Sequence, residues 1–295
     1  MKENVFILGI NGYSGKAFKN YVTSRKLFLK YNFIGVDKFI SDVNSEICIL
    51  ETDLSKNNWD YIFKDYKPDY IVNLVGRSTN CSFEDMISTN VILTQSLFEY
   101  ILQNKISVKK ILLIGSAAEY GRNNQLPLHE KSELLPVNFY GMSKLFQTNL
   151  AKYYHDNYSL PICIARTFNI LGGEMPKTLA IGSFKAQISA IENGGTIFTG
   201  NLDTKRDYLH IDDVIDAYWA ILIHGIFGEI YNVSSGKSIA IIELLNTLIA
   251  NSGKSIEIIT SGDKVKKNDI RDSFGSNNKL ISLGWSQKLD VLTSI

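Results

Sequence analysis

The sequence predicts an α/β fold in which a doubly wound parallel sheet carries helices on both faces. Up to about residue 170, short runs rich in Val, Ile, Leu and Phe alternate with segments of helical periodicity. The apolar runs are continuous instead of alternating with polar residues, as expected for parallel strands buried on both faces. A chain of 295 residues is long enough for such a domain and a smaller lobe.

Each predicted strand is a short apolar run, and each predicted helix is a longer segment of mixed polarity. Strands are predicted at residues 5–10, 33–37, 47–50, 70–75, 110–115, 161–166 and 229–233. Helices are predicted at residues 14–26, 56–65, 84–104, 140–157, 178–193, 212–224 and 239–252. After residue 170 glycines cluster and the rhythm changes, which predicts a smaller C-terminal α/β lobe. We expect the sheet domain to span 1–170 and about 212–235, and the lobe about 171–211 and 236–295.

The composition excludes several classes of protein. The formal net charge is +1 and no long block of like charges occurs, so neither nucleic acid nor an acidic membrane is an expected partner. No apolar run approaches the roughly 18 residues needed to cross a bilayer, and no secretory signal precedes the first strand. Cys48, Cys81 and Cys163 are odd in number and lie in or near apolar runs. They are expected to be reduced thiols, which favours a cytoplasmic protein.

The cysteines and histidines also lack metal-ligand spacing, so no metal is expected. His210 with Asp212 and Asp213 is the one grouping that suggests a metal. The segment "YLHIDDVIDAYWAILI" is better explained as a strand end followed by a helix with acids in its first turn.

A glycine-rich turn joins the first predicted strand to the first predicted helix. The stretch "GINGYSG" places Gly9, Gly12 and Gly15 there. Glycine allows positive φ and lets the backbone approach a pyrophosphate, while the helix N-terminus offers free N–H groups. Asp37 ends the second strand, where a carboxylate would bind both ribose hydroxyls of a dinucleotide. These features predict a dinucleotide site, the alternative being a glycine-rich turn with a solvated acid.

Asp37 favours NAD(H), because its charge would repel the 2′-phosphate of NADP(H). Lys38 follows it and leaves NADP(H) possible. Asp53 and Leu54 follow the next strand and are expected beside the adenine. A helix N-cap by Asp53 or Ser55 explains this stretch equally well.

Two short motifs predict the reactive groups. "FYGMSK" places Tyr140 and Lys144 four residues apart, on one face of a helix. The ammonium is expected to lower the pKa of the phenol, so that tyrosine can exchange a proton with a substrate oxygen. Ser116, in "GSAAEYG" at the end of a strand, is expected to hold the same oxygen. The alternative is a surface Tyr–Lys pair.

Taken together, these motifs resemble the extended short-chain dehydrogenase/reductases, the NAD-dependent epimerase/dehydratase family that acts on nucleotide sugars. The resemblance covers nearly the whole chain and continues through "RTFNILGG", "RDYLHIDDV", "GEIYNVSSG" and "GW". It implies a Rossmann fold with a C-terminal substrate lobe. The implied catalytic residues are Ser116, Tyr140 and Lys144.

The resemblance also implies the binding residues. Those expected to contact the cofactor are Gly9, Asn11, Gly12, Tyr13, Gly15, Asp37, Lys38, Asp53, Leu54, Leu74, Val75, Gly76, Asn90, Tyr140, Lys144 and Thr167. Those expected to contact a nucleotide-diphosphate sugar are Arg77, Ser116, Ala117, Ala118, Asn169, Arg206 and Arg271. Arg206 is expected to pair with the diphosphate and Arg271 with the diphosphate or ribose. The alternative for Arg206 is a structural ion pair with Asp207. The alternative for Asn169 is a turn-forming role.

The chain differs from the related 4,6-dehydratases in the residues that follow the serine. The dehydratases carry acids there, whereas this chain has two alanines. Ala117 and Ala118 cannot move protons, and Glu119 is displaced by one residue. If the segment is extended, Glu119 points to the other side. The motif therefore disfavours a dehydratase.

With a dehydratase disfavoured, the motifs predict oxidation or reduction at a single carbon of the sugar. The motifs most resemble GDP-4-keto-6-deoxy-D-mannose reductases, which predicts NAD(P)H-dependent reduction of the C4 ketone of a nucleotide-diphospho-4-keto-6-deoxyhexose. A nucleotide-sugar 4-epimerase with retained NAD is the alternative, and a non-catalytic dinucleotide sensor is a third. "LGGEMP" stands where that family usually has Gly-Pro-Gly-Gln. The base (GDP, dTDP or CDP) and the sugar therefore stay open.

The resemblance further implies a homodimer built on helices 84–104 and 140–157, which family members pair into a four-helix bundle. The stretch "LFQTNLAKYYHDNY" carries apolar and aromatic residues suited to such an interface. The alternative is that this face packs entirely within its own subunit.

Overall fold

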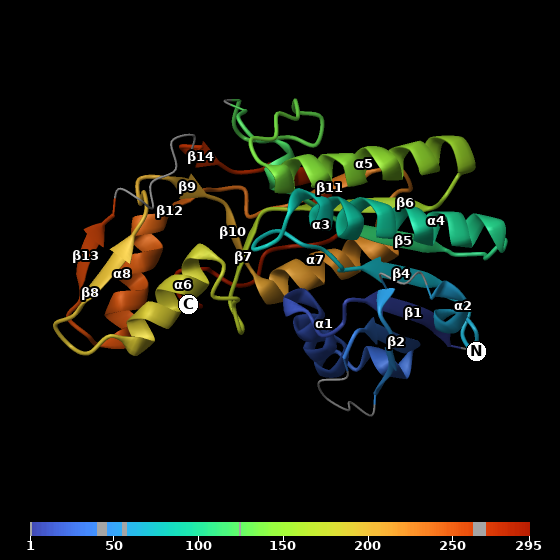
Figure 1. The fold of residues 1–295 in the computed structure, drawn as a ribbon, viewed down its shortest axis with the longest axis horizontal. Helices are drawn as coiled ribbons and strands as arrows, with labels where there is room; N and C mark the ends of the chain where they lie inside the picture. The colour runs from blue at the N-terminus through green and yellow to red at the C-terminus, as the bar shows by residue number, and fades with distance from the viewer. Residues whose placement is uncertain (1, 40–45, 55–57, 124, 262–269) are drawn as a thin grey trace.

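A computed structural model describes residues 2–39, 46–54, 58–123, 125–261 and 270–295. Its centre is a seven-stranded parallel sheet in the order β11-β6-β5-β4-β1-β2-β3 (Figure 1). These strands are β1 (Glu3–Leu8), β2 (Tyr31–Asp37), β3 (Ile47–Glu51), β4 (Tyr70–Asn73), β5 (Lys110–Ser116), β6 (Ile162–Thr167) and β11 (Ile230–Val233). The predicted doubly wound α/β fold is confirmed.

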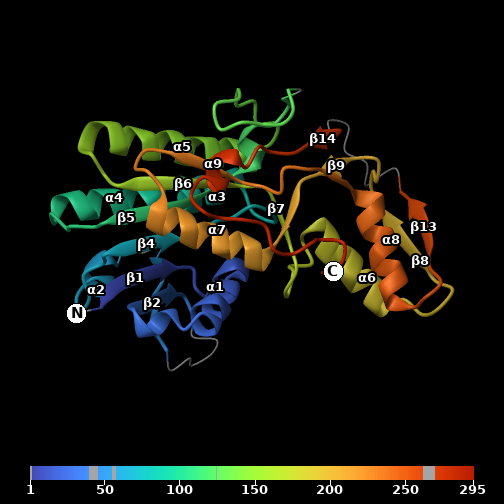
Figure 2. The ribbon, with the colours of Figure 1, turned by 180° about the vertical axis from the view of Figure 1, so that it is seen from behind.

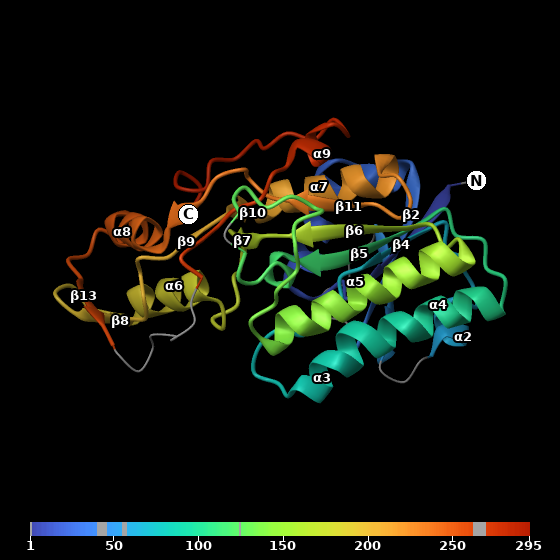
Figure 3. The same ribbon diagram turned by 90° about the horizontal axis from the view of Figure 1, so that it is seen from above.

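Helices cover both faces of this sheet (Figures 1 and 3). One face carries α1 (Tyr13–Ser24) and α7 (Ile211–His224); the other carries α2 (Trp59–Ile62), α3 (Phe83–Ile87), α4 (Leu93–Gln103) and α5 (Phe139–Tyr158). Each face has its own apolar core: Phe18 and Val22 pack with α7, and Leu97 and Phe98 pack with Trp59. The strands contribute side chains to both cores, which explains their continuous apolar runs.

The long helix predicted for 84–104 is divided into three parts. A π-helical segment, Ser88–Ile92, joins α3 to α4. Single π turns inside helices frequently occur at functional sites. This one places Asn90 in the protein interior, next to the loop that follows β4.

The smaller lobe lies beyond the C-terminal ends of the strands (Figure 2). Its elements, with the two short strands β7 and β10 that lead to it, are β7 (Asn169–Leu171), α6 (Ala180–Ala190), β8 (Thr196–Thr199), β9 (Lys205–Arg206), β10 (Tyr208–His210), β12 (Ile239–Ala240), α8 (Ile241–Ser252), β13 (Glu257–Thr260) and β14 (Asp272–Ser273). A third apolar core, which includes Phe184, Leu244, Leu245 and Val291, holds it together.

The chain passes between the sheet domain and the smaller lobe several times. After β14 it returns to the sheet, where α9 (Asn278–Ile281) places Leu280 in the core beside α7. Leu128, in the loop after β5, exchanges backbone hydrogen bonds with Phe274 and Ser276 on this returning segment.

The start of α7 explains the acidic cluster in the sequence. The side chain of His210 caps α7 by accepting from the N–H of Asp212, and buried Asp213 accepts from the N–H groups of Lys288 and Leu289. The predicted strand end followed by a helix with acids in its first turn is confirmed, but the residue that caps the helix is His210 and not an acid. Across the described ranges, no three His, Cys, Asp or Glu residues are grouped as metal ligands. Within the same ranges, no helix has the length and apolar character required to span a membrane.

Candidate active site

A cavity of about 350 Å³ opens at the C-terminal ends of β1, β4, β5 and β6. Strand order reverses here, because β4 and β2 lie on opposite sides of β1. In doubly wound sheets, ligands bind at such a switch point. The cavity brings together the glycine turn, the loop after β4, the end of β5 and the first turns of α5.

The glycine turn has the geometry of a phosphate cradle. Gly9 has φ +82°, and a Cβ on Gly15 would lie 2.3 Å from the carbonyl oxygen of Gly9. Gly12 begins α1, and no described side chain caps that end of the helix. Its N–H groups are therefore positioned for an anion, and the turn fits the pyrophosphate of a dinucleotide.

The end of β2 carries the predicted ribose site. Asp37 accepts from the N–H of Asn11 at 2.8 Å and from the N–H of Lys38 at 2.7 Å, which fixes the carboxylate beside the cradle. The Lys38 ammonium lies 3.1 Å from a carboxylate oxygen of Asp53. Asp53 thus restrains the cation that follows Asp37, a relation that the sequence did not indicate. Leu54 is buried.

The loop after β4 forms one wall of the cavity, through Leu74, Val75, Gly76 and Arg77. Asn90 fixes this loop: its side chain accepts from the N–H of Arg77 and donates to the Arg77 carbonyl and to Ser143. In this structure the amide of Asn90 thus contacts the loop and α5, and its predicted role as a cofactor contact remains a prediction.

Ser116, Tyr140 and Lys144 line the same cavity. Asn138 caps α5 by accepting from the N–H of Gly141, so Tyr140 lies in the first turn of the helix and Lys144 one turn later. Lys144 Nζ donates to the carbonyl of Ile114 at 2.8 Å. It also donates to Oε1 of Gln147 at 2.9 Å.

The prediction that Lys144 lowers the pKa of Tyr140 is wrong for this arrangement. Burial raises the pKa of Tyr140, a hydrogen bond with Ser116 opposes the rise, and the charge of Glu119 adds to it. The ammonium of Lys144 is directed at Ile114 and Gln147, and burial lowers its own pKa to about 8. Tyr140 therefore keeps its proton at neutral pH.

Two further predicted contacts support the floor of the cavity. Thr167, at the end of β6, shares a hydrogen bond of 2.9 Å with the phenol of Tyr218 on α7. Tyr13 lines the cavity and donates to the carbonyl of Gly172. Burial raises the pKa of both tyrosines, so both phenols stay protonated at neutral pH.

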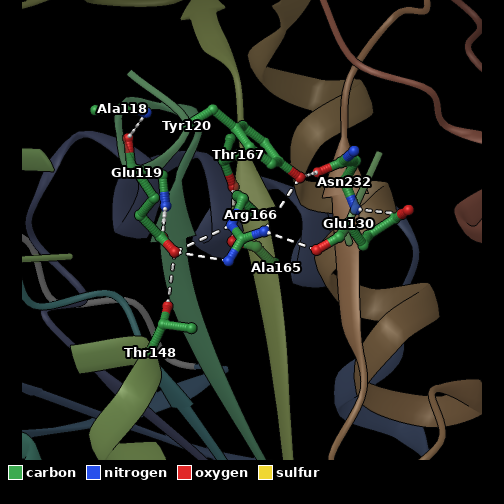
Figure 4. Close-up of polar contacts among 10 residues, drawn as sticks. Ala118, Glu119, Tyr120, Glu130, Thr148, Ala165, Arg166, Thr167 and Asn232 are labelled. Atoms are coloured by element: carbon green, nitrogen blue, oxygen red, sulfur yellow. Dashed lines mark hydrogen bonds and ion pairs between the residues drawn. The ribbon is translucent and has the colours of Figure 1, made fainter. Parts of the chain in front are cut away.

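The segment after Ser116 is not extended, contrary to the assumption made from the sequence. Ala117–Glu119 forms a 3₁₀ turn, because Ser116 accepts from the N–H of Ala118 and Glu119 accepts from the N–H of Ser116. The conclusion about Glu119 holds for a different reason: the turn directs its carboxylate into the protein, 2.8 Å from Arg166 (Figure 4).

The predicted substrate residues are distributed between the cavity and the lobe. Arg77 lines the cavity, and its guanidinium lies 3.7 Å from Asp85. Asn169 donates from both its backbone N–H and its amide to the carbonyl of Asp207, which joins β7 to β10. Arg206 donates to the backbone carbonyls of Lys205 and Ile270.

Asp207 has a structural role. Its carboxylate accepts from the N–H groups of Ser235, Gly236 and Gly275, and burial raises its pKa to about 6. These bonds fix the segments that connect the sheet domain and the smaller lobe. Arg271 has an exposed side chain, and its carbonyl accepts from the N–H of Lys205.

Several residues that shape the site were missed from the sequence. Gln147 holds Lys144, Tyr218 holds Thr167, and Arg166 holds Glu119. One signal was available: Arg166 ends an otherwise apolar strand, "PICIAR", and a charge inside a buried strand requires a buried partner.

The cradle at the switch point and the Ser116, Tyr140 and Lys144 set define a class: enzymes that use a bound dinucleotide for redox chemistry. A model of the NAD dependent epimerase/dehydratase family matches residues 5–234, and the chain belongs to this family. The family comprises NAD(P)-dependent oxidoreductases and epimerases of sugar nucleotides. The resemblance inferred from the motifs is thereby confirmed.

Individual relatives are distant in sequence and similar in fold. The chain is 26% identical over 305 residues to GDP-6-deoxy-D-mannose reductase of Pseudomonas aeruginosa, covering 100% of this chain and 95% of the relative. The structure of RMD from Pseudomonas aeruginosa complexed with NADPH has a TM-score of 0.83 at 24% identity, covering 99% of this chain and 96% of the other. UDP-glucuronic acid 4-epimerase from Bacillus cereus, with UDP-glucuronic acid and NAD, has a TM-score of 0.86 at 21% identity, covering 99% and 96%.

Proposed function

We propose that the protein reduces the C4 ketone of a nucleotide-diphospho-4-keto-6-deoxyhexose in deoxysugar biosynthesis. One observation carries the proposal: the described lining of the cavity contains Ser116, Tyr140 and Lys144 and no carboxylate. Elimination of water across C5 and C6 needs a second acid–base group beside the tyrosine, whereas reduction of a ketone needs only one proton donor. The relative at 26% identity, a GDP-6-deoxy-D-mannose reductase, agrees with this choice.

The residues divide the chemistry as follows. Tyr140 donates its proton to the carbonyl oxygen as that oxygen becomes an alcohol, and its raised pKa keeps the proton available at neutral pH. Ser116 holds the same oxygen by a hydrogen bond. When bound, the nicotinamide cofactor supplies the hydride. Lys144 lies one turn beyond Tyr140 and places a positive charge near the developing alkoxide.

For the cofactor, NAD(H) is the proposed preference, with NADP(H) as the alternative. Asp37 presents a carboxylate at the end of β2, where it would repel a 2′-phosphate. Asp53 restrains Lys38, the cation that would otherwise be available to that phosphate. The NADPH bound to the Pseudomonas aeruginosa protein keeps the alternative open.

The smaller lobe is the proposed site of the sugar nucleotide. Arg77 reaches the cavity from the sheet domain, while Asn169, Arg206 and Arg271 lie on the segments that lead to the lobe or return from it. Guanidinium groups suit a diphosphate because their donors form a fixed fork. The three free cysteines agree with a reducing, cytoplasmic location.

The test is a cofactor-consumption assay. NADH or NADPH is supplied with 4-keto-6-deoxyhexoses on GDP, dTDP and CDP, and the products are identified by NMR. Stoichiometric loss of reduced cofactor with one substrate, abolished in Tyr140→Phe, is the expected result. No loss with any substrate, together with interconversion of unmodified UDP- or GDP-hexoses without added cofactor, would assign a 4-epimerase instead.

A homodimer is also proposed, through the outer face of the helices α3, α4 and α5. Phe139, Phe146 and Tyr153 recur every seven residues on α5 and are 60%, 43% and 53% exposed, and Ile92 on the neighbouring π segment is 48% exposed. The helices α4 and α5 lie side by side (Figure 3), and exposed apolar side chains along them suit a four-helix contact with a second copy. Light scattering at micromolar concentration is expected to give twice the chain mass, falling to one chain in Phe146→Asp. A single-chain mass for the wild type would refute the dimer.

A further inference from the structure

Glu119 and Arg166 form an ion pair that is wholly enclosed by protein. Both side chains are 0% exposed, and the guanidinium lies 2.8 Å from the carboxylate. Removing two charges from water costs free energy that their attraction only partly recovers, so a buried pair is weak evidence of a stabilising role. The location of this pair, directly behind the catalytic residues, suggests another role.

The carboxylate of Glu119 connects three elements of the site (Figure 4). One oxygen accepts from the backbone N–H of Ser116, at the end of β5, at 2.8 Å. The other accepts from the hydroxyl of Thr148 on α5 at 2.9 Å and from Nε and Nη2 of Arg166 on β6, at 3.0 and 2.8 Å. Both carboxylate oxygens are therefore engaged.

Thr148 belongs to the catalytic face of α5. It follows Lys144 by four residues and Tyr140 by eight, so the three side chains lie along one side of the helix. The turn after Ser116 also packs closely on this helix, because a Cβ on Gly141 would lie 2.4 Å from the carbonyl oxygen of Ala118. Glu119 thus joins the strand that carries the serine to the helix that carries the tyrosine and lysine.

Arg166 is itself held by further hydrogen bonds. Its Nη1 donates to the phenol of Tyr120 at 3.1 Å and to the carbonyl of Glu130 at 3.3 Å. Tyr120 in turn donates to Asn232 on β11 at 2.6 Å (Figure 4). The pair is therefore anchored across β5, β6 and β11, and Glu119 has a fixed position from which to hold Ser116.

The charge of Glu119 also acts on the reactive groups. It raises the pKa of Tyr140 and opposes the fall that burial imposes on the pKa of Lys144. Other titratable groups that face this cluster include Arg166 on β6, which pairs with Glu119, and Tyr218 on α7, next to Tyr140. Tyr120 and Glu130 lie on the far side of Arg166 from Glu119.

We propose that Glu119 is a positioning residue for the reaction: its buried carboxylate fixes the distance between Ser116 on β5 and the catalytic face of α5. The kinetic test of this inference rests on the proposed ketoreduction. A second test, the titration of Lys144, needs no sugar substrate. Glu119 touches neither substrate nor cofactor in this assignment, because it is not among the described residues that line the cavity and both of its carboxylate oxygens are engaged within the protein.

The first test removes one connection and leaves the ion pair intact. Thr148→Val is nearly isosteric and lacks the hydroxyl that donates to Glu119, while Thr148→Ser keeps it. Thr148→Val is expected to lower kcat by about tenfold or more, since a misplacement of about 1 Å costs on the order of 10²-fold. KM and the affinity for NADH are expected to stay unchanged, and Thr148→Ser is expected to restore kcat. A kcat for Thr148→Val equal to that of wild type would overturn the proposal.

The second test reads the site without a sugar. Lysine labelled with ¹³C at Cε reports the titration of Lys144, whose resonance is the one missing from Lys144→Met. Glu119→Gln keeps the shape of the side chain and removes its charge, so Lys144 is expected to titrate at lower pH than in wild type. Thermal unfolding and NADH binding show whether the variant is folded. An unchanged midpoint in a folded Glu119→Gln would contradict the electrostatic part of the assignment.

The two tests also separate the inference from the proposed function. A wild-type protein that reduces no ketosugar refutes the function, and the Thr148 variants are then compared in whichever sugar-nucleotide reaction the protein catalyses. If Glu119→Gln does not fold, Lys144 is titrated in Thr148→Val, where the retained charge of Glu119 is expected to leave the midpoint unchanged while kcat falls. Loss of thermal stability in Thr148→Val with an unaltered kcat would make the pair purely structural.

Discussion

Lys144 allows the sharpest quantitative prediction, because its ammonium is buried. Burial lowers its pKa from the ordinary value of 10.5 to about 8. Between these two pH values the unfolded chain binds a proton that the folded protein does not, so the stability conferred by this site rises with pH. A difference of about 2.5 units corresponds to about 3 kcal/mol.

Lys144→Met removes this titration. We expect the free energy of unfolding of the wild type, measured in urea, to gain about 3 kcal/mol relative to Lys144→Met between about pH 7.5 and about pH 10.5. The hydrogen bonds lost with the ammonium, to Ile114 and Gln147, shift the comparison at every pH and do not alter its slope. Lys152→Met, which changes an exposed lysine of the same helix, is the control. A difference between wild type and Lys144→Met that stays constant across this range would refute the reasoning.

Three further changes test the site. Tyr140→Phe is expected to keep NADH binding, followed by fluorescence, and to lose about 10²–10⁴-fold in turnover; near-normal turnover would remove Tyr140 from proton transfer. Gly15→Ala places a Cβ 2.3 Å from the carbonyl oxygen of Gly9 and is expected to abolish dinucleotide binding in calorimetry, so retained affinity would contradict the cradle. Asp37→Ala is expected to weaken NAD binding and to raise the relative affinity for NADP; an unchanged ratio would count against the ribose contact.

The sheet and its helices could be predicted because each follows from a local pattern. The strands are continuous apolar runs, and the glycine turn and the Tyr140–Lys144 spacing are short-range signals. The division of the 84–104 helix by a π segment was not predictable, because it depends on the contact between Asn90 and the loop at Arg77.

The direction in which the pKa of Tyr140 shifts also depended on information that a sequence does not contain. The i, i+4 spacing correctly placed Lys144 on the face that carries Tyr140. It could not show that Ile114 and Gln147 bind the ammonium, or that Glu119 adds a negative charge nearby. Apart from the Lys144–Gln147 bond within α5, these contacts join residues more than 20 positions apart, and they exist only once the strands are assembled.

The repeated passage of the chain between the sheet domain and the smaller lobe has a consequence for how the molecule assembles. Asp207 receives hydrogen bonds from Ser235, Gly236 and Gly275, and Leu128 pairs with Phe274 and Ser276. These partners are separated by about 30 to 150 positions in the sequence, so neither the sheet domain nor the smaller lobe can be completed from one continuous piece of chain. Contacts of such long range slow folding, because loop closure must precede their formation. The smaller lobe is therefore expected to acquire its structure late, after the segment from Phe274 to Ser276 has docked on the sheet.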